Sequence, residues 1–320
     1  MIEVKNLTKK FGVLIAVDNI SFSVRRGEIF GFLGPNGAGK STTISMLATL
    51  LKPDSGQAII NGFDVNLERN QVRKSIGLVF QDSSLDDRLT AAENLYFHAD
   101  LYGVDKKIFK ERLSEVLKLV DLCDRRDHIV KTFSGGMKRR LEIARGLIHY
   151  PLVMFLDEPT IGLDPQTRFN IWEYVLKLRQ EKNMTIFMTT HYLNEAEYCG
   201  RIAIIDQGKI VALDTPANLK KLVGGDIITM AAVNLAKLKF EIESKFNLKT
   251  KTQDAKLIIE TTDGDKFLPR LFNELEEKIQ SVELRKPTLD DVFLNLTGKK
   301  IRAEEASNKD IMKQTIVMGR

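Results

Sequence analysis

Short apolar runs at strand-like spacing dominate the first quarter of the chain. IEVKNL, NISFSV and EIFGFLG lie before residue 35, and QAIING and SIGLVFQ follow before residue 82. Runs of this length, bounded by polar or glycine-rich turns, predict β-strands. The pattern breaks at GPNGAGK, after which STTISMLATL has the spacing of a helix. We therefore expect a strand, a glycine-rich loop and a helix in direct succession.

The middle of the chain changes from helical to strand spacing. Apolar residues recur at helical intervals in two stretches, Phe109, Leu113, Val116 and Val120, and Met137, Leu141, Ala144 and Ile148. LVMFLDE, MTIFMTT and RIAIIDQ are then nearly continuous apolar runs of the fully buried kind, with the helical TRFNIWEYVLKLRQ among them. Strands that alternate with helices predict an α/β fold with a mostly parallel sheet, which binds ligands at the carboxyl ends of its strands. A helical insert is expected at residues 90–150.

The pattern changes again after about residue 224. Strand-like and helical segments follow in the order β-α-β-α-β, with LKTKTQ as a candidate edge strand, which favours a small, ferredoxin-like α+β domain. The predicted organisation is an α/β domain over 1–222, an α+β domain over 225–298 and a tail over 299–320. The tail carries six basic and three acidic residues, and we expect it to be mobile.

Composition excludes some classes of protein and leaves others open. With 320 residues, 43% of them hydrophobic and 28% charged, the chain has ordinary globular usage and is not disordered throughout. The net charge of +5 suits an anionic membrane face as well as nucleic acid. Cys123 and Cys199 lack metal spacing and are expected to be free thiols in a reducing compartment. No run of apolar residues is long enough to span a bilayer, so we expect work at a membrane to need a partner.

The strongest chemical signal is the loop at residues 34–42. Gly34, Gly39, Lys40 and Ser41 satisfy the pattern G-x-x-x-x-G-K-[ST] between a predicted strand and a predicted helix. Glycines in this loop let backbone N–H groups surround phosphate oxygens, while the lysine reaches the β- and γ-phosphates and the serine binds Mg²⁺. The loop therefore predicts binding of a nucleoside triphosphate.

Polar residues end three further predicted strands. Asp157 ends a buried strand, where a P-loop enzyme needs an Mg²⁺ ligand. Glu158 follows it and is placed to orient or deprotonate a water molecule aimed at the γ-phosphate. Gln81 and His191 end two other strands. Four polar strand ends in one sheet predict a catalytic site for ATP hydrolysis.

A second candidate anion site lies in FSGGMKRR at residues 133–140. Ser134, Gly135 and Gly136 precede a helical pattern, and a helix start of this kind binds anions through its N–H groups. A nucleotide has one triphosphate, which the loop at 34–42 already holds. The second site is therefore expected to close over the nucleotide of another copy, in a head-to-tail dimer around two ATP molecules.

Six segments together resemble the motifs of the ATP-binding-cassette (ABC) ATPases. GPNGAGKST, Gln81, FSGGMKRR, VMFLDEP, IGLD and His191 are similar to the P-loop, Q-loop, signature, Walker B, D-loop and H-loop, in that order and over nearly all of residues 1–222. The resemblance implies a P-loop NTPase cassette with a mixed sheet core and a helical insert. Its signature departs from the common LSGGQ at Phe133 and Met137, while the serine and glycines that touch phosphate are intact.

The resemblance also assigns further residues. Phe11 matches the aromatic residue that stacks on adenine, and Asp164 matches the D-loop acid that crosses the dimer interface. ATP contacts are implied for the whole P-loop, which includes Pro35, Asn36, Gly37, Ala38 and Thr42. Ligands for Mg²⁺ are implied at Ser41, Gln81 and Asp157, and catalytic roles at Lys40, Glu158 and His191.

The segment KPTLDDVFLNLTG at 286–298 resembles the C-terminal module of ATPase subunits of ABC-2-type exporters, similar to the daunorubicin-resistance kind. This implies an ATP-hydrolysing subunit that pairs with a second copy or a paralogous cassette. It also implies a separate integral-membrane permease, a cytoplasmic location on the inner face of the membrane, and no nucleic-acid partner. QDSSLDDRLTAAENL, which begins at Gln81, is the expected permease contact. The transported substrate is not specified, because substrate contacts belong to the permease.

Two other functions share these motifs. Soluble ABC ATPases act on DNA ends or ribosomes, but the DNA-repair type inserts a long coiled coil between the P-loop and Walker B, and the ribosomal type usually carries two cassettes. A regulatory module without hydrolysis conflicts with the presence of Lys40, Asp157, Glu158 and His191. Membrane association that depends on a hydrophobic partner subunit distinguishes the exporter from the soluble enzymes.

Overall fold

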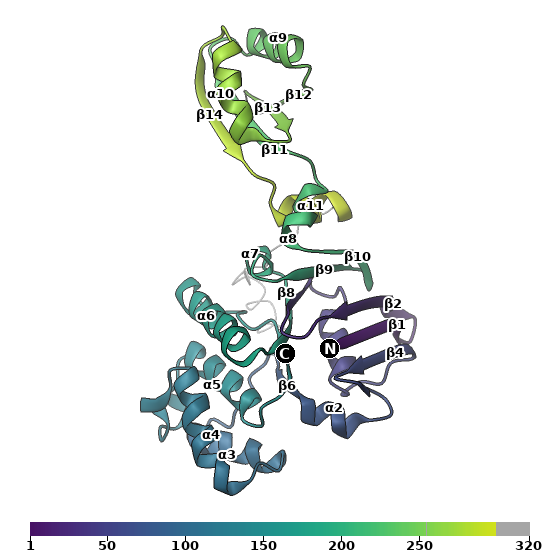
Figure 1. Cartoon of the computed structure of the whole chain (residues 1–320), viewed down its shortest axis with the longest axis vertical. Coiled ribbons are helices and arrows are strands. Elements are labelled where there is room, and N and C mark those ends of the chain that lie inside the picture. Colours follow the sequence, from purple (N-terminus) through teal and green to yellow (C-terminus); the bar gives the residue numbers. More distant parts are fainter. Residues whose placement is uncertain (254, 299–320) are drawn as a thin grey trace, which may run out of the picture. The chain divides into compact units, whose positions relative to one another are not determined.

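The computed structural model describes residues 1–253 and 255–298, which form two compact units (Figure 1). The first unit spans Met1–Leu213, and the second contains the described residues from Asp214 onward. The residues of the expected tail lie outside the described part of the chain.

The division between the units falls earlier than the boundary expected at residue 222. The reason is the packing of two helices, since α8 (Pro216–Lys221) contacts α11 (Leu289–Thr297) near the end of the described chain. Leu219 of α8 and Val292 of α11 are both buried. The second unit therefore includes a helix that the sequence pattern assigned to the first.

The first strands of the chain form an antiparallel sheet with the order β2-β1-β4-β5. Its members are β1 (Ile2–Phe11), β2 (Leu14–Val24), β4 (Ser55–Ile60) and β5 (Phe63–Asp64). Along the start of β1 the buried Ile2 and Val4 alternate with exposed residues, as in a sheet that covers a core with one face.

A second sheet contains the strands whose carboxyl ends were expected to carry the site residues. Its order is β10-β9-β3-β8-β7-β6, and β9, β3, β8, β7 and β6 pair in parallel. Every residue of β3, β7 and β8 is buried, which matches the continuous apolar runs of these strands. The members are β3 (Ile29–Leu33), β6 (Ile76–Val79), β7 (Val153–Asp157), β8 (Thr185–Thr190), β9 (Arg201–Asp206) and β10 (Lys209–Asp214).

Helices of the first unit include the predicted insert between β6 and β7. In Figure 1 the insert helices α3, α4 and α5 gather together, apart from the antiparallel sheet. The helix α3 begins with a capping box, in which Thr90 and Glu93 bond each other's backbone N–H. The bounds are α1 (Lys40–Leu47), α2 (Arg69–Ser75), α3 (Ala91–Leu101), α4 (Lys106–Leu119), α5 (Gly135–Leu147), α6 (Pro165–Lys182) and α7 (Leu193–Ala196), with 3₁₀ turns at Cys123–Arg125 and Val130–Thr132.

Aromatic side chains join the two sheets of the first unit. The ring of Phe22 on β2 lies 5.5 Å from Phe30, 5.6 Å from Phe32 and 5.9 Å from Phe187, centroid to centroid. These contacts connect β2 to β3 and β8. Close packing of this kind holds the strands rigidly, so the loops that follow β3 and β8 start from fixed positions.

The second unit is a small α+β domain. Its sheet has the antiparallel order β12-β13-β11-β14, with β12 as the edge strand predicted at LKTKTQ. Together with two helices it gives the ferredoxin-like sequence β-α-β-β-α-β, built around the buried Met230, Ile242 and Leu271. The members are β11 (Asp226–Ala232), α9 (Leu235–Phe246), β12 (Thr250–Gln253), β13 (Lys256–Thr261), α10 (Gly264–Glu274) and β14 (Ile279–Arg285).

Among the helices of residues 1–253 and 255–298, none has the length and apolar character needed to cross a bilayer.

Candidate functional site

The glycine-rich loop joins β3 to α1, as the sequence predicts. Gly37 has φ +79° and Gly39 has φ +106°, a backbone conformation that L side chains rarely adopt. At Gly39 a Cβ atom would lie 2.4 Å from the carbonyl oxygen of Ala16. The loop therefore needs glycine at residue 39 both for its conformation and for its close approach to β2.

Lys40 is the first residue of α1 and only 4% exposed. Its Nζ donates to the carbonyl oxygens of Gly34 at 2.8 Å and Pro35 at 3.1 Å. It also forms an ion pair with Oε1 of Glu158 at 3.0 Å. A buried ammonium needs carboxylate and carbonyl partners of this kind to offset its loss of hydration, and its position within the loop suits it to meet a phosphate.

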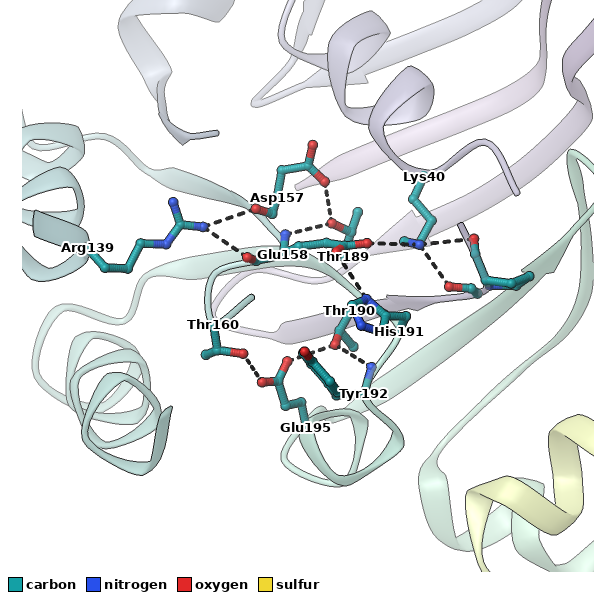
Figure 2. A network of polar contacts seen from close by, with 12 residues as sticks. Lys40, Arg139, Asp157, Glu158, Thr160, Thr189, Thr190, His191, Tyr192 and Glu195 are labelled. Carbon is teal, nitrogen blue, oxygen red and sulfur yellow. Dashed lines mark hydrogen bonds and ion pairs between the residues drawn. The ribbon is translucent and has the colours of Figure 1, made fainter. Parts of the chain in front are cut away.

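Glu158 is the central residue of this site (Figure 2). Its backbone has φ +45°, which is uncommon for a residue other than glycine. Its second carboxylate oxygen lies 3.0 Å from Nδ1 of His191. Burial raises the pKa of Glu158, but the hydrogen bond from His191 and the charge of Lys40 outweigh burial and lower it below its usual value. Glu158 is therefore an ionised carboxylate held between two nitrogen groups at neutral pH.

Thr189 on β8 holds the neighbouring Asp157. Its Oγ1 donates to Oδ1 of Asp157 at 2.5 Å and accepts from the backbone N–H of Glu158 at 3.0 Å. One buried hydroxyl thus orients the carboxylate of Asp157 and the backbone of Glu158. The sequence analysis missed this residue, although its place two residues before His191 in MTIFMTTH could have pointed to it.

The four expected strand ends lie side by side, because β3, β8, β7 and β6 are neighbours in the sheet. Lys40, Glu158 and His191 are in direct contact. Gln81 follows β6 and lines the same cavity as Lys40 and Glu158, which has a volume of about 600 Å³. Other lining residues are Phe11, Leu14, Ile15, Ala16, Asn36, Gly37, Gly39, Ser41, Thr42, Gln207 and Gly208.

The cavity suits a magnesium nucleotide. Phe11 is 48% exposed at the end of β1 and lines the cavity, so its ring is available to a flat base. Serine hydroxyl, amide and carboxylate oxygens of the kind at Ser41, Gln81 and Asp157 are the ligands that Mg²⁺ prefers. Ser41 and Gln81 offer such oxygens from the lining of the cavity, whereas Asp157 directly precedes the lining residue Glu158 and is not itself among the lining residues.

The segment expected to form a second anion site lies at the start of α5, where Ser134 is the N-cap residue. Oγ of Ser134 accepts from the N–H of Met137 at 3.3 Å and caps the helix. At Gly136 a Cβ atom would lie 2.4 Å from Thr167 on α6. Asp164 caps α6 by accepting from the N–H of Thr167 at 3.0 Å. Gly135 and Gly136 thus lie near Leu163 and Thr167, on either side of Asp164 in the sequence, while no residue of 133–140 is among those that line the P-loop cavity in the described chain.

Arg139 is a further site residue that the sequence analysis missed. Its guanidinium is 7% exposed and donates to the carbonyl oxygens of Phe80, Asp157, Glu158 and Pro159, and to the carboxylate of Glu142 at 2.9 Å. It thereby ties α5 to the residues that follow β6 and β7; Figure 2 shows its contacts with Asp157 and Glu158. Nothing in the run KRR distinguishes the buried arginine from its partly buried neighbours Lys138 and Arg140, so the sequence pattern alone gives no signal for it.

Comparison with known proteins places this geometry in a family. Residues 17–161 match the ABC transporter family. The chain is 40% identical over 312 residues to the linearmycin resistance ATP-binding protein LnrL of Bacillus subtilis (strain 168), which covers 94% of this chain and 100% of LnrL. It is 39% identical over 306 residues to the daunorubicin/doxorubicin resistance ATP-binding protein DrrA of Streptomyces peucetius, with 93% and 92% of the two chains covered.

A solved structure with the same fold extends the comparison to the reaction. The ATP-binding cassette MJ0796, in a dimeric post-hydrolysis state bound to ADP and Pi, matches with a TM-score of 0.62 and 31% identity. The match covers 67% of this chain and 98% of that one. Because relatives of about 40% identity extend over nearly the whole chain and a similar cassette holds the products of ATP hydrolysis, the chain belongs to the ABC transporter family as an ATP-binding, ATP-hydrolysing subunit.

Proposed function

We propose that two cassettes of this kind, either two copies of the chain or one copy and a paralogue, close head to tail around two ATP molecules. The observation that supports this arrangement is the position of the signature start. Gly136 lies against Thr167, whose N–H donates to Asp164, and neither Ser134 nor Gly136 is among the residues that line the P-loop cavity of their own chain. A second anion-binding helix start and an interface acid on one surface suit a symmetric contact with another cassette.

Each site residue then has a role in hydrolysis. The P-loop N–H groups and Lys40 hold the phosphates, and Phe11 stacks on the adenine. Mg²⁺ bound by Ser41, Gln81 and Asp157 would neutralise charge on the phosphate oxygens. In the structure Lys40 and Glu158 form an ion pair; when Lys40 turns to the γ-phosphate, Glu158 is left to accept a proton from the attacking water. His191 keeps Glu158 oriented and contributes a hydrogen-bond donor at the γ-phosphate.

The relatives named for drug resistance favour an ABC-2-type exporter in which a separate integral-membrane permease carries the substrate. ATP binding would close the dimer and product release would reopen it, so that the permease changes conformation. The chain would then work in the cytoplasm on the inner face of the membrane, bound through the permease. The identity of the substrate belongs to that partner.

The surface for the permease is proposed at α3 and the segment after Gln81. Asn94 on α3 accepts from the N–H of Asp86 at 2.9 Å and donates to the carbonyl of Asp86 at 3.0 Å, so α3 and this segment form one surface. Phe97 and Leu101, one helical turn apart on α3, are 62% and 67% exposed. Exposed apolar side chains on this surface suit an apolar partner.

Co-expression with a candidate hydrophobic membrane subunit tests the proposal. We expect the wild-type chain to sediment with membranes only when that subunit is present. Phe97→Glu should abolish the association while ATPase activity of the isolated chain remains. Leu67→Glu is the matched control, because Leu67 is an exposed leucine of the same unit at 85% exposure outside the proposed surface. Equal membrane association of both variants would contradict the docking surface, and association without the subunit would contradict the permease.

A further inference from the structure

A buried acid joins the loop of Asp164 to the strand end of His191. Glu195 on α7 is 2% exposed and accepts two hydrogen bonds, one from the hydroxyl of Thr160 and one from the hydroxyl of Thr190 at 2.7 Å. Thr160 belongs to the loop between Glu158 and Asp164, and Thr190 directly precedes His191. Figure 2 shows the carboxylate of Glu195 between the two threonines.

Arg168 on α6 makes a second connection between the same segments. Its guanidinium donates to the carbonyl oxygen of Leu163 at 3.4 Å. It also lies over the ring of Tyr192, 4.0 Å from the centroid. Leu163 precedes Asp164, and Tyr192 follows His191. Two independent contacts therefore fasten the Asp164 loop to the segment that carries His191.

We propose that Glu195 is a positioning residue that makes the Asp164 loop and the His191 segment move as one body. The inference rests on the proposed dimer, in which a second cassette contacts the Asp164 loop. Displacement of that loop on docking would then be passed through Thr160 and Glu195 to Thr190, and so to the contact between His191 and Glu158. Glu195 would couple the arrival of the second cassette to the geometry of hydrolysis without touching nucleotide.

The hydrogen bonds from the hydroxyl groups of Thr160 and Thr190 to Glu195, called the bridge below, can be tested by substitution. Thr160→Val keeps the size of the side chain and removes the donor, whereas Thr160→Ser keeps the donor. Glu195→Gln keeps the shape but turns one acceptor oxygen into an NH₂ group, which cannot accept from a hydroxyl. Thr185→Val is the matched control, because Thr185 is a fully buried threonine at the opposite end of β8 whose hydroxyl accepts from the backbone N–H of Gly27 at 3.0 Å.

Hydrogen exchange of the full, nucleotide-free chain measures the bridge without any reaction. In Thr160→Val and Glu195→Gln, the backbone N–H groups of residues 161–164 and 191–193 should exchange about fivefold faster, as expected for loss of one ordinary hydrogen bond. Thr160→Ser and Thr185→Val should exchange like the wild type in these segments. Unchanged exchange in Thr160→Val and Glu195→Gln would overturn the bridge, whatever the chain's activity.

Kinetics then separate positioning from a purely structural role. We expect Thr160→Val and Glu195→Gln to lower kcat roughly tenfold to a hundredfold, as misplacement of catalytic groups does, with the dissociation constant for ATP within about twofold of wild type. Thr160→Ser should restore kcat. Faster exchange with an unchanged kcat would overturn the coupling and leave Glu195 structural. Absence of ATPase activity or dimer formation in the wild type would instead contradict the proposed function.

Discussion

At the scale of single residues, Glu158 combines a strained backbone, burial and two charged or hydrogen-bonding partners. A left-handed conformation costs free energy in a residue with a side chain, and such residues gather at functional sites. Here the strain turns the carboxylate toward Lys40 and His191 at 3.0 Å each. The backbone outlier and the ion pair thus support the same residue as the base for hydrolysis.

We predict that Glu158→Gln keeps ATP binding and loses turnover. The amide is nearly the same size as the carboxylate but cannot accept a proton from water, and a positioned base contributes about 10²–10⁴-fold to rate. The chain should then accumulate as an ATP-bound dimer, measurable by size-exclusion chromatography with and without ATP. Hydrolysis at the wild-type rate would remove Glu158 from the mechanism.

The lowered pKa of Glu158 predicts a pH dependence of stability. A carboxyl whose folded pKa lies below its unfolded pKa stabilises the fold above the unfolded value, and this stability is lost as pH falls through the folded pKa. The pKa of Glu158 is lowered in the folded chain, so its contribution is present at neutral pH and decreases below about pH 4.5. Urea unfolding of wild type and Glu158→Gln at several pH values should show a difference that shrinks with acidification. A difference that grows on acidification would contradict the direction of the shift.

At the scale of elements, the starts of α5 and α6 are held against each other. A Cβ at Gly136 would lie 2.4 Å from Cγ2 of Thr167, whereas at Gly135 the nearest atom is 3.7 Å away. Thr167 cannot turn aside freely, because its hydroxyl donates to Asp164 at 2.6 Å. The contact therefore fixes the signature start relative to the D-loop acid.

We expect Gly136→Ala to destabilise the nucleotide-free chain by about 1–3 kcal/mol, the usual cost of overpacking. Gly135→Ala should be neutral or slightly stabilising, since alanine favours helix over glycine. Urea unfolding of both variants measures the difference. Equal stability of the two would show that the two helix starts separate easily.

At the scale of the whole molecule, the head-to-tail dimer predicts complementation between two inactive variants. Ser134→Arg blocks the signature start, and Lys40→Ala removes the phosphate ligand. Each variant alone should be inactive. In a mixed dimer, one site combines the intact P-loop of the first variant with the intact signature of the second, so mixing should recover part of the ATPase activity. Normal hydrolysis by Ser134→Arg alone would contradict the head-to-tail arrangement.

We propose that the second unit is an accessory domain that supports dimer formation or transport. The adenine, phosphate and Mg²⁺ residues named above all precede residue 192. A chain that ends at Leu213, where the first unit ends, should therefore fold and bind ATP, while its dimer fraction or its transport with the permease falls. Affinity for ATP and dimer fraction against the full chain measure this. Lost ATP binding in a folded truncation would contradict the division, and unchanged dimerisation and transport would make the domain a passive appendage.

The sequence by itself determined the elements and most of the site. Strand and helix periodicity predicted the parallel sheet and the insert, because burial on one or both faces leaves a repeat in the apolar pattern. The glycine-rich loop and the acids after LVMFL were expected at strand ends that meet at one edge, and the structure has these strands as neighbours in one sheet. The order β3-β8-β7-β6 was not readable from this pattern, since strand pairing is non-local.

Only the tertiary structure decided which polar residues hydrogen-bond to the candidate catalytic residues or their neighbours and so fix their positions. Arg139 and Glu195 look like ordinary members of polar runs and Thr189 like the end of a buried strand. Their contacts depend on the groups that distant segments bring to them. The sequence pattern also does not show which unit α8 belongs to. Its contact with α11 places it in the second unit. Local periodicity predicts that a side chain is buried. It does not predict which group that side chain contacts, because the contact depends on the packing of segments far apart in the chain.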